Sequence, residues 1–330
     1  LLCLCLCLCL CLCPTADPAE DNTGAESPTE PAGQWDESDV VADLALSCPA
    51  PERPSTLDNY TRVNAPATLG ETGLYSDIAS GTLEAGVEAY RPLHELWADG
   101  GTKRRWLRLP AGERIDTSDM DNWRFPVGTR AWKEMSRDGQ RIETRLLWKK
   151  DNDRWVRAAY QWNEAQSEAE LVLEHRSDAH SSGHDIPSVE GCRSCHEGIA
   201  DTLAGVSAIQ LDHDEDGLNL SRLDSAGLLS DSPEGRFSIP GDATAQAALG
   251  YLHTNCGNCH NPTTINPNWI TVEFALQTDA LQTVADTAVY RTAVGVQKGN
   301  SRPVSGLNSE TLIAAGDPDQ SLAYLRMQRT

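Results

Sequence analysis

Four cysteines of the chain stand in two copies of one short pattern. The first copy is Cys192-Arg-Ser-Cys195-His196 and the second is Cys256-Gly-Asn-Cys259-His260. Two thiols three positions apart on one helical turn can each add to a haem vinyl group, and the adjacent imidazole then reaches the iron. The doubled pattern therefore predicts two covalently attached c-type haems, with His196 and His260 as the proximal iron ligands and the thioethers formed by Cys192, Cys195, Cys256 and Cys259.

Two other interpretations of these cysteines stay open at this stage. A structural zinc ion could take two thiolates and an imidazole from one motif, or all four thiolates from both. A redox-active pair of thiols is the second alternative. Zinc does not require a histidine directly after the second thiol in both copies, so the pattern favours haem.

The sixth ligand of each iron is harder to assign. Met327 follows His260 by 67 residues, a workable distance for the second haem, but little chain remains after it for a closing helix. No methionine lies between the two motifs. We expect Met120 and Met135 to pack inside the β region. The candidates for the first haem are therefore histidines, namely His175, His180, His184, His213 and His253.

Composition limits the classes of protein to which the chain can belong. It has 330 residues, enough for two domains, and its Asp and Glu outnumber Lys and Arg by 49 to 27, a net charge of −22. Such a surface repels phosphate backbones, which argues against nucleic-acid binding. No apolar run has the roughly 20 residues of a transmembrane helix. We expect a redox protein as partner, with a basic docking face.

The start of the chain predicts export. Residues 1–13 alternate Leu with Cys and have the length of a signal-peptide core, although no basic segment precedes them. Cys13 follows Leu12 where a lipidated cysteine normally follows Gly or Ala. Residues 14–57 begin acidic and proline-rich and are expected to be a disordered linker. Thioether attachment is extracytoplasmic in bacteria, so we expect a periplasmic or cell-surface location, and Cys48 has no assigned role.

The region from 58 to 183 has the pattern of an antiparallel β domain. Residues 141–149 and 155–162 alternate apolar and polar side chains on either side of an Asp-Asn-Asp turn, which is typical of a hairpin. Residues 103–109, 129–135 and 169–173 are expected to be further strands. Seven of the nine Trp fall between Trp97 and Trp162, and they are expected to form the core rather than a ligand platform.

The two motifs have different expected settings. Residues 243–255 predict a helix that leads into the second motif, with Asp242 as N-cap. Pro187 and Gly191 precede the first motif and discourage a helix, so we expect that haem on a loop. Between them, Asp212, Asp214 and Asp216 begin a pattern like a calcium loop, but its last position is Leu223 instead of Glu. A solvated acidic turn is therefore the favoured interpretation, with calcium binding as the alternative.

The chain resembles a family of exported, functionally uncharacterised bacterial c-type cytochromes with a β-rich front domain. The resemblance covers about Asp58 to the end and implies haem attachment and an exported redox role. In such families a Met-Pro-Pro segment and a final helix usually follow, so we expect this sequence to be truncated at its C-terminus. The matching segments are Tyr90–Lys103, Phe125–Thr129, Glu143–Leu147, Tyr160–Trp162, His184–Pro187, both CxxCH motifs and Gly316–Ser321.

Together these observations predict an α+β fold. An antiparallel β-rich domain over 58–183 would precede a mainly α-helical, cytochrome c-like region over 184–330. The expected function is electron transfer by an exported two-haem cytochrome. A dihaem peroxidase-like or other haem oxidoreductase is the alternative, and a surface-binding module that carries haem is a second one. No catalytic residue is assigned.

Overall fold

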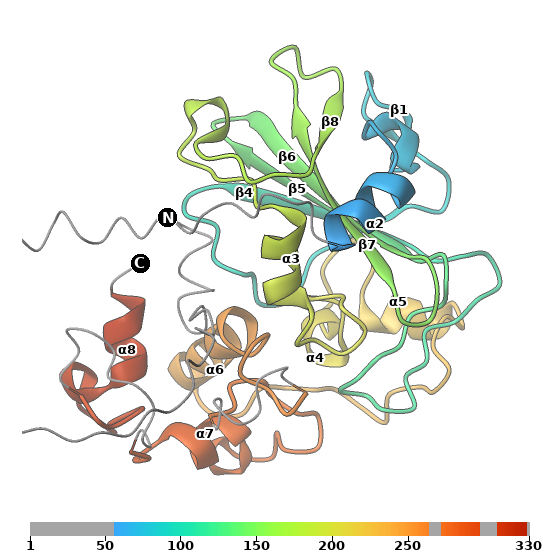
Figure 1. The fold of residues 1–330 in the computed structure, drawn as a ribbon. Coiled ribbons are helices and arrows are strands. Elements are labelled where there is room, and N and C mark those ends of the chain that lie inside the picture. Colours follow the sequence, from blue (N-terminus) through green and yellow to red (C-terminus); the bar gives the residue numbers. More distant parts are fainter. Residues whose placement is uncertain (1–55, 264–271, 298–308, 329–330) are drawn as a thin grey trace, which may run out of the picture.

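The structure is a computed structural model that describes residues 56–263, 272–297 and 309–328. The predicted leader, with Cys13, and nearly all of the predicted linker, with Cys48, lie outside these residues. Figure 1 shows a β-sheet in one half of the molecule, with the helices of the second motif gathered in the other. Helix α3, which carries the first motif, lies between them.

A six-stranded antiparallel sheet forms the first half of the molecule. Its strands lie side by side in the order in which they occur along the chain, from β3 to β8. They are β3 (Glu88–Tyr90), β4 (Thr102–Arg108), β5 (Arg130–Arg137), β6 (Gln140–Lys149), β7 (Trp155–Trp162) and β8 (Ala169–Val172). The predicted β-rich region is confirmed, and each of its five predicted strands is present within two residues. A small separate sheet pairs β1 (Tyr75–Asp77) with β2 (Thr82–Leu83).

One face of the large sheet carries most of the aromatic core. Trp106 on β4 pairs with Trp132 on β5, which pairs with Leu146 on β6, and all three are almost fully buried. Helix α2 (Thr56–Asn64) lies over this face, where Tyr60 packs against the cluster. The prediction that the tryptophans form the core is confirmed for five of the seven, namely Trp106, Trp123, Trp132, Trp155 and Trp162. Trp97 is exposed and Trp148 is partly buried.

A second core cluster joins the sheet to the chain that follows it. Leu107 and Trp155 from the sheet pack with apolar residues between Leu203 and Leu229. Helices α4 (Ala208–Leu211) and α5 (Leu220–Ser225) contribute to this cluster. The core is therefore continuous across residue 183, where the sequence suggested a change of domain.

In the described part of the region after the sheet the helices are short, and a mainly α-helical, cytochrome c-like region is not shown. The longest of these helices is α6 (Ala243–Asn255), and α3 (Val189–His196), α7 (Ala288–Ala293) and α8 (Leu322–Met327) have eight residues or fewer. Turns connect them, together with the single-turn 3₁₀ segments η3 (Val284–Asp286) and η4 (Pro318–Gln320). Two more 3₁₀ segments, η1 (Gly70–Thr72) and η2 (Ala179–Ser181), lie earlier in the chain. Frequent Gly, Pro, Asp and Asn residues stop helices after a few turns.

In the described parts of the chain, no helix combines the length and the apolar character needed to cross a bilayer.

Candidate functional site

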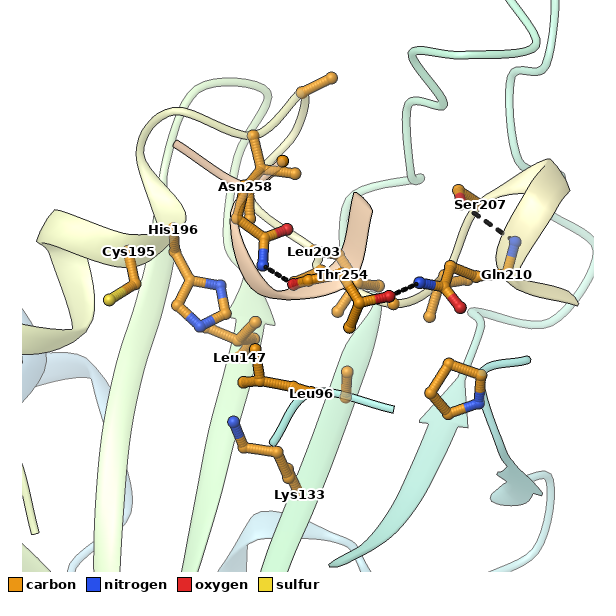
Figure 2. A pocket seen from close by; sticks show the side chains of 18 of the residues that line it. Leu96, Lys133, Leu147, Cys195, His196, Leu203, Ser207, Gln210, Thr254 and Asn258 are labelled. Atoms are coloured by element: carbon orange, nitrogen blue, oxygen red, sulfur yellow. Dashed lines mark hydrogen bonds between the residues drawn. The ribbon is translucent and has the colours of Figure 1, made fainter. Parts of the chain in front are cut away.

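A cavity of about 510 Å³ lies between the sheet and the segments that follow it. Its volume is within the range of roughly 300–1,000 Å³ typical of small-molecule and cofactor sites. All three predicted ligating residues of the first motif line it, and so do Gly257, Asn258 and Cys259 of the second motif. Figure 2 shows His196 and Cys195 on one side of this space and Lys133 on another.

The first motif lies on a helix, so the prediction of a loop was wrong. Helix α3 begins after Ser188, whose side-chain oxygen accepts a hydrogen bond from the Gly191 N–H at 3.2 Å. Pro187 stands before this N-cap, where its missing N–H costs the helix nothing. The N-cap offsets the weak helix propensity of Gly191. Cys192 and Cys195 consequently lie one turn apart, as thioether attachment requires.

His196 is held with one particular ring nitrogen directed into the protein. Its Nδ1 lies 2.8 Å from the backbone carbonyl oxygen of Thr202, and a carbonyl can only accept, so Nδ1 carries the proton. Burial lowers the pKa of His196 to about 3, with the positive charge of Lys133 adding to the shift. The ring is therefore neutral near pH 7, and Nε2 is the nitrogen left to bind a metal.

The loop that supplies the Thr202 carbonyl has a strained backbone. Asp201 and Thr202 have φ angles of 45° and 70°, a region that costs free energy for residues other than glycine, above all for β-branched ones. Asp201 fastens the loop, because its carboxylate accepts from Lys149 Nζ at 2.6 Å and from Trp155 Nε1 at 2.9 Å. It also accepts from the Phe125 N–H at 2.6 Å. Strands β6 and β7 thus hold in place the loop whose Thr202 carbonyl accepts the hydrogen bond from His196.

The second motif follows the helix that the sequence predicted. Helix α6 has the predicted bounds, and Asp242 caps it by accepting from the Ala245 N–H at 2.9 Å. Residues 256–260 then form a turn, in which the His260 N–H donates to the Cys256 carbonyl at 2.9 Å. Gly257 is needed in this turn, because a Cβ there would lie 2.3 Å from the carbonyl oxygen of His253.

His260 has the same arrangement as His196, reached by a different route. Its Nδ1 lies 3.2 Å from the carbonyl oxygen of Val272, twelve residues later. Burial lowers the pKa of His260, and the ring is in edge contact with Phe274, with centroids 5.2 Å apart at 64°. The Phe274 N–H also donates to the His260 carbonyl at 2.8 Å. Both motif imidazoles therefore keep Nε2 for a ligand.

The two motifs are close in space. The Thr263 hydroxyl, just after the second motif, donates to the carbonyl of Gly198, just after the first, at 3.2 Å. The shared cavity leads to the same conclusion. Across the described residues, no group of three or more Cys, His, Asp or Glu side chains forms a ready-made metal site of the zinc type.

Most of the histidines that the sequence proposed as sixth ligands are bound elsewhere in the protein. His184 Nε2 lies 2.7 Å from Glu143, and His180 Nε2 lies 2.7 Å from the Trp162 carbonyl. His253 accepts from the Leu276 N–H at Nδ1, so its Nε2 carries the proton and cannot coordinate iron. His213 uses both ring nitrogens. His175 lies 3.7 Å from Asp185 and half in solvent.

His94 is a candidate ligand that the sequence did not single out. It lines the cavity, and its Nε2 is buried with no hydrogen-bond partner among the described residues. The ring lies against Gly250 of α6, where a Cβ would come within 2.3 Å of it. The His94 N–H donates to the side-chain oxygen of Gln210, and the Thr254 hydroxyl donates to the His94 carbonyl. Gln210 in turn donates to Thr254 at 2.6 Å, and Figure 2 marks this hydrogen bond with a dashed line. No local sequence signal links residues this far apart.

Three methionines remain as possible sulfur ligands. Met327 lies at the end of α8, and the charge of the adjacent Arg326 reaches His260 and lowers its pKa slightly further. Helix α8 is therefore close to the second motif, in keeping with the predicted pairing of Met327 with that haem. Met120 and Met135 both pack in or beside the core as expected, but they also line the cavity.

The acidic sequence from 212 to 216 is organised by an arginine. Arg236 lies 2.6 Å from Asp212 and 2.9 Å from Asp214, while Asp216 is fully exposed and lies 3.8 Å from Arg222. Asp212 is buried and also accepts from the Phe237 N–H at 2.5 Å. Ion pairs and a hydrogen bond thus hold this segment to residues 236–237, so Asp212 is buried instead of solvated as the sequence suggested.

No family model, no curated protein and no solved structure matches this chain. The resemblance drawn from the short sequence motifs accordingly stays a prediction.

Proposed function

We propose that this protein is an exported two-haem c-type cytochrome that transfers electrons. The observation that carries the proposal is the matched setting of the two motif histidines. Each imidazole directs Nδ1 at a backbone carbonyl of a downstream segment and keeps Nε2 for a ligand. One such ring is common in proteins, but two of them directly following CxxC pairs are what covalent haem attachment requires.

The residues present fit this cofactor. Cys192 and Cys195 would hold the first haem and Cys256 and Cys259 the second, with thioether bonds in each case. Bound haem supplies an iron that alternates between Fe(II) and Fe(III), so one electron can enter and leave without a change in bonding. The chain's own part is to fix both imidazoles, neutralise them by burial and keep water away. A fixed ligand lowers the reorganisation needed at each electron transfer.

The remaining parts of the proposal concern partner and location. The net charge of −22 favours a redox partner with a basic face, since opposite charges speed encounter. Thioether attachment outside the cytoplasm favours a periplasmic or cell-surface protein. Nucleic acid remains an unfavourable partner for so acidic a surface.

The test is haem stoichiometry in the full-length protein, purified from a host competent in c-type cytochrome maturation. We expect two haems per chain by pyridine haemochrome. The double variant Cys192→Ala/Cys195→Ala and the double variant Cys256→Ala/Cys259→Ala should each retain one. A colourless wild-type protein, or a haem that survives when all four motif cysteines are replaced in one protein, would refute the proposal.

A haem oxidoreductase of the peroxidase type is the second candidate function. It is favoured by the cavity beside His196, which is large enough to admit a small molecule next to the first motif. Consumption of peroxide by the reduced protein would support it, and complete inertness would remove it. A surface-binding role for the tryptophans loses its basis, because five of the seven in the β region are buried.

A further inference from the structure

The face of the sheet that borders the cavity carries an unusual row of cations, which we call the cationic row. It consists of Arg105 on β4, Lys133 on β5 and Arg145 on β6. These residues are direct cross-strand partners, so three like charges stand side by side on adjacent strands. Like charges in this position destabilise a sheet. On β7 the partner of Arg145 is Ala159, and Arg157 lies two residues from Ala159 on the same face of the sheet.

The protein neutralises this row only in part. Arg145 is paired with Glu143, which is fully buried and lies within 2.9 Å of the guanidinium. Arg105 is 7% exposed and has Glu95 at 4.0 Å. In the part of the chain that the structure describes, the Lys133 ammonium has no hydrogen-bond or ion-pair partner. The Nε of Arg157 is buried and also without a partner.

Other groups around the cavity do not complete the neutralisation. Asp119, Asp121, Asp185 and Asp279 line it, and the carboxylates of the first three lie on Asn122, Thr278 and His175. Lys103 lines it as well and donates to the carbonyls of Leu96 and Trp97. Burying a cation without a negative partner is costly. The centre of the row is therefore arranged for an anion that is not part of the chain.

The row faces the first motif across the cavity. Lys133 exerts the largest charge effect of any side chain on His196, so the two groups are close. Cys192 in turn acts on Lys133. Figure 2 shows the Lys133 side chain, rising from β5, and the His196 ring directed toward the same space.

We propose that the cationic row and Arg157 bind a small inorganic oxyanion beside the first haem. The proposal rests on the proposed function, because it places the anion in a haem pocket. Haem itself carries two carboxylates, which share this chemistry and could use the same cations. The free oxyanion is the occupant that we infer, since Lys133 lies at the centre of the row, directly across from the imidazole that would bind the iron. Such a site makes the first haem a ligand-binding centre.

The experiment titrates the full-length holoprotein with nitrite, as the probe anion, and follows the Soret band. We expect saturable binding to the wild type. Lys133→Met keeps the side-chain length and removes the charge, so nitrite affinity should fall at least about tenfold, as expected for loss of a charge-assisted contact. Arg105→Gln should weaken binding in the same direction. Imidazole, a neutral ligand, should bind Lys133→Met and the wild type equally.

The chain offers a matched control on the same strand. Arg104 is adjacent to Arg105 but points to the other face of β4, where its side chain is 68% exposed and lies over Trp106. Arg104→Gln removes the same charge from the protein and should leave the nitrite affinity within about twofold. An equal loss in Arg104→Gln and Arg105→Gln would mean that only net charge matters and would overturn the proposal.

Three further outcomes would overturn it. One is the absence of a nitrite-dependent shift up to millimolar concentration in a protein shown to contain two haems, a result that leaves the proposed function intact. Another is a Lys133→Met variant with changed haem content or potential and unchanged nitrite affinity, since the cations would then serve the haem carboxylates. The last is nitrite binding that appears only in His94→Ala, because His94 would then occupy the sixth position. Fewer than two haems would instead contradict the proposed function.

Discussion

The two CxxCH motifs share a short sequence but have opposite surroundings. The first lies on helix α3 against the sheet, beside the cations Lys133, Arg145 and Arg157, which line the same cavity. The second lies in a turn after α6, and its neighbours Phe274 and Val272 belong to an apolar cluster. Yet both histidines have the same hydrogen bond at Nδ1. The pattern therefore determines which atoms are presented, whereas the surroundings determine the electrostatic environment of each site.

That difference suggests a division of roles. An apolar, tightly packed site suits an electron carrier, because nothing has to rearrange when the charge on the iron changes. A polar site with unneutralised cations suits a ligand. The four predictions that follow test whether the contrast between the two sites is real.

The largest expected effect comes from the buried carboxylate of the first site. Glu143→Gln removes the negative charge between Arg145 and His184, and leaves buried cations uncompensated. We expect a loss of about 3–5 kcal/mol in the free energy of unfolding, measured by urea denaturation of the holoprotein. The control is Glu134→Gln on the opposite face of the sheet. Burial raises the pKa of Glu134, which means that the fold disfavours its negative charge. Removing this charge should therefore lower the free energy of unfolding by no more than about 1 kcal/mol.

Acid should weaken the first site through Glu143. Burial alone would raise the pKa of Glu143, but Arg145 and the hydrogen bond from His184 outweigh it and lower the pKa from 4.5 to about 2. A depressed pKa stabilises the fold fully above pH 4.5, and the stabilisation is lost as the pH falls toward 2. The loss is about 3 kcal/mol. In a pH series of urea melts, Glu143→Gln should lack this dependence, and an unchanged slope in the variant would contradict the assignment.

A third prediction compares the same position in the two motifs. Gly257→Ala puts a Cβ within 2.3 Å of the His253 carbonyl and 3.0 Å of the Ala275 backbone, neither of which can move easily. We expect the free energy of unfolding, measured by urea denaturation, to fall by about 1–3 kcal/mol and the absorption spectrum of the second haem alone to change. Arg193→Ala, at the equivalent position of the first motif, removes only half-exposed ion pairs with Glu190 and Glu197 and should cost less than about 1 kcal/mol.

The smallest effect concerns the ring next to the second imidazole. Phe274→Leu keeps the backbone hydrogen bond to His260 and removes the edge contact between the rings. The free energy of unfolding should fall by about 1 kcal/mol, and the midpoint potential of the second haem should shift while that of the first stays constant. Tyr290→Leu, an exposed aromatic change elsewhere in the same half, should alter neither quantity. Equal shifts at both haems would argue that the two sites share one environment.

Local patterns in the sequence predicted the sheet and helix α6 well. In the strands on either side of the Asp151–Asp153 turn every second residue faces the same side of the sheet, and the turn fixes their pairing over a short distance. Asp242 marks the start of α6 because its side chain satisfies a free N–H of the first turn. In both cases the determining interaction lies within a few residues of the element it defines.

The first motif shows where local reasoning failed. Pro187 and Gly191 are local signals against a helix, but Ser188 lies between them and caps one. A proline before the N-cap is compatible with a helix, so the order of the three residues decided the outcome. A cytochrome-like helical region was expected because of the motifs themselves, and motifs carry no information about the length of helices around them.

The cationic row and His94 could not have been found by the same means. Each cation of the row sits in its own strand, and only the register of β4, β5 and β6 brings the three together. The burial of His94 depends on Gly250, 156 positions later in the chain. Such features depend on tertiary pairing. A partial signal existed, since inward strand positions that hold Arg or Lys instead of an apolar residue break the expected alternation.

The order of the strands has a consequence for how the protein is made. Within the sheet, each strand from β3 to β8 lies beside its neighbours in the chain, and such short-range pairing is fast to form. Chains also emerge from the ribosome N-terminus first. The sheet is complete at Val172, twenty residues ahead of Cys192. One wall of the cavity is therefore built from strands that precede both pairs of thiols in the chain, so it can form before either pair is in place.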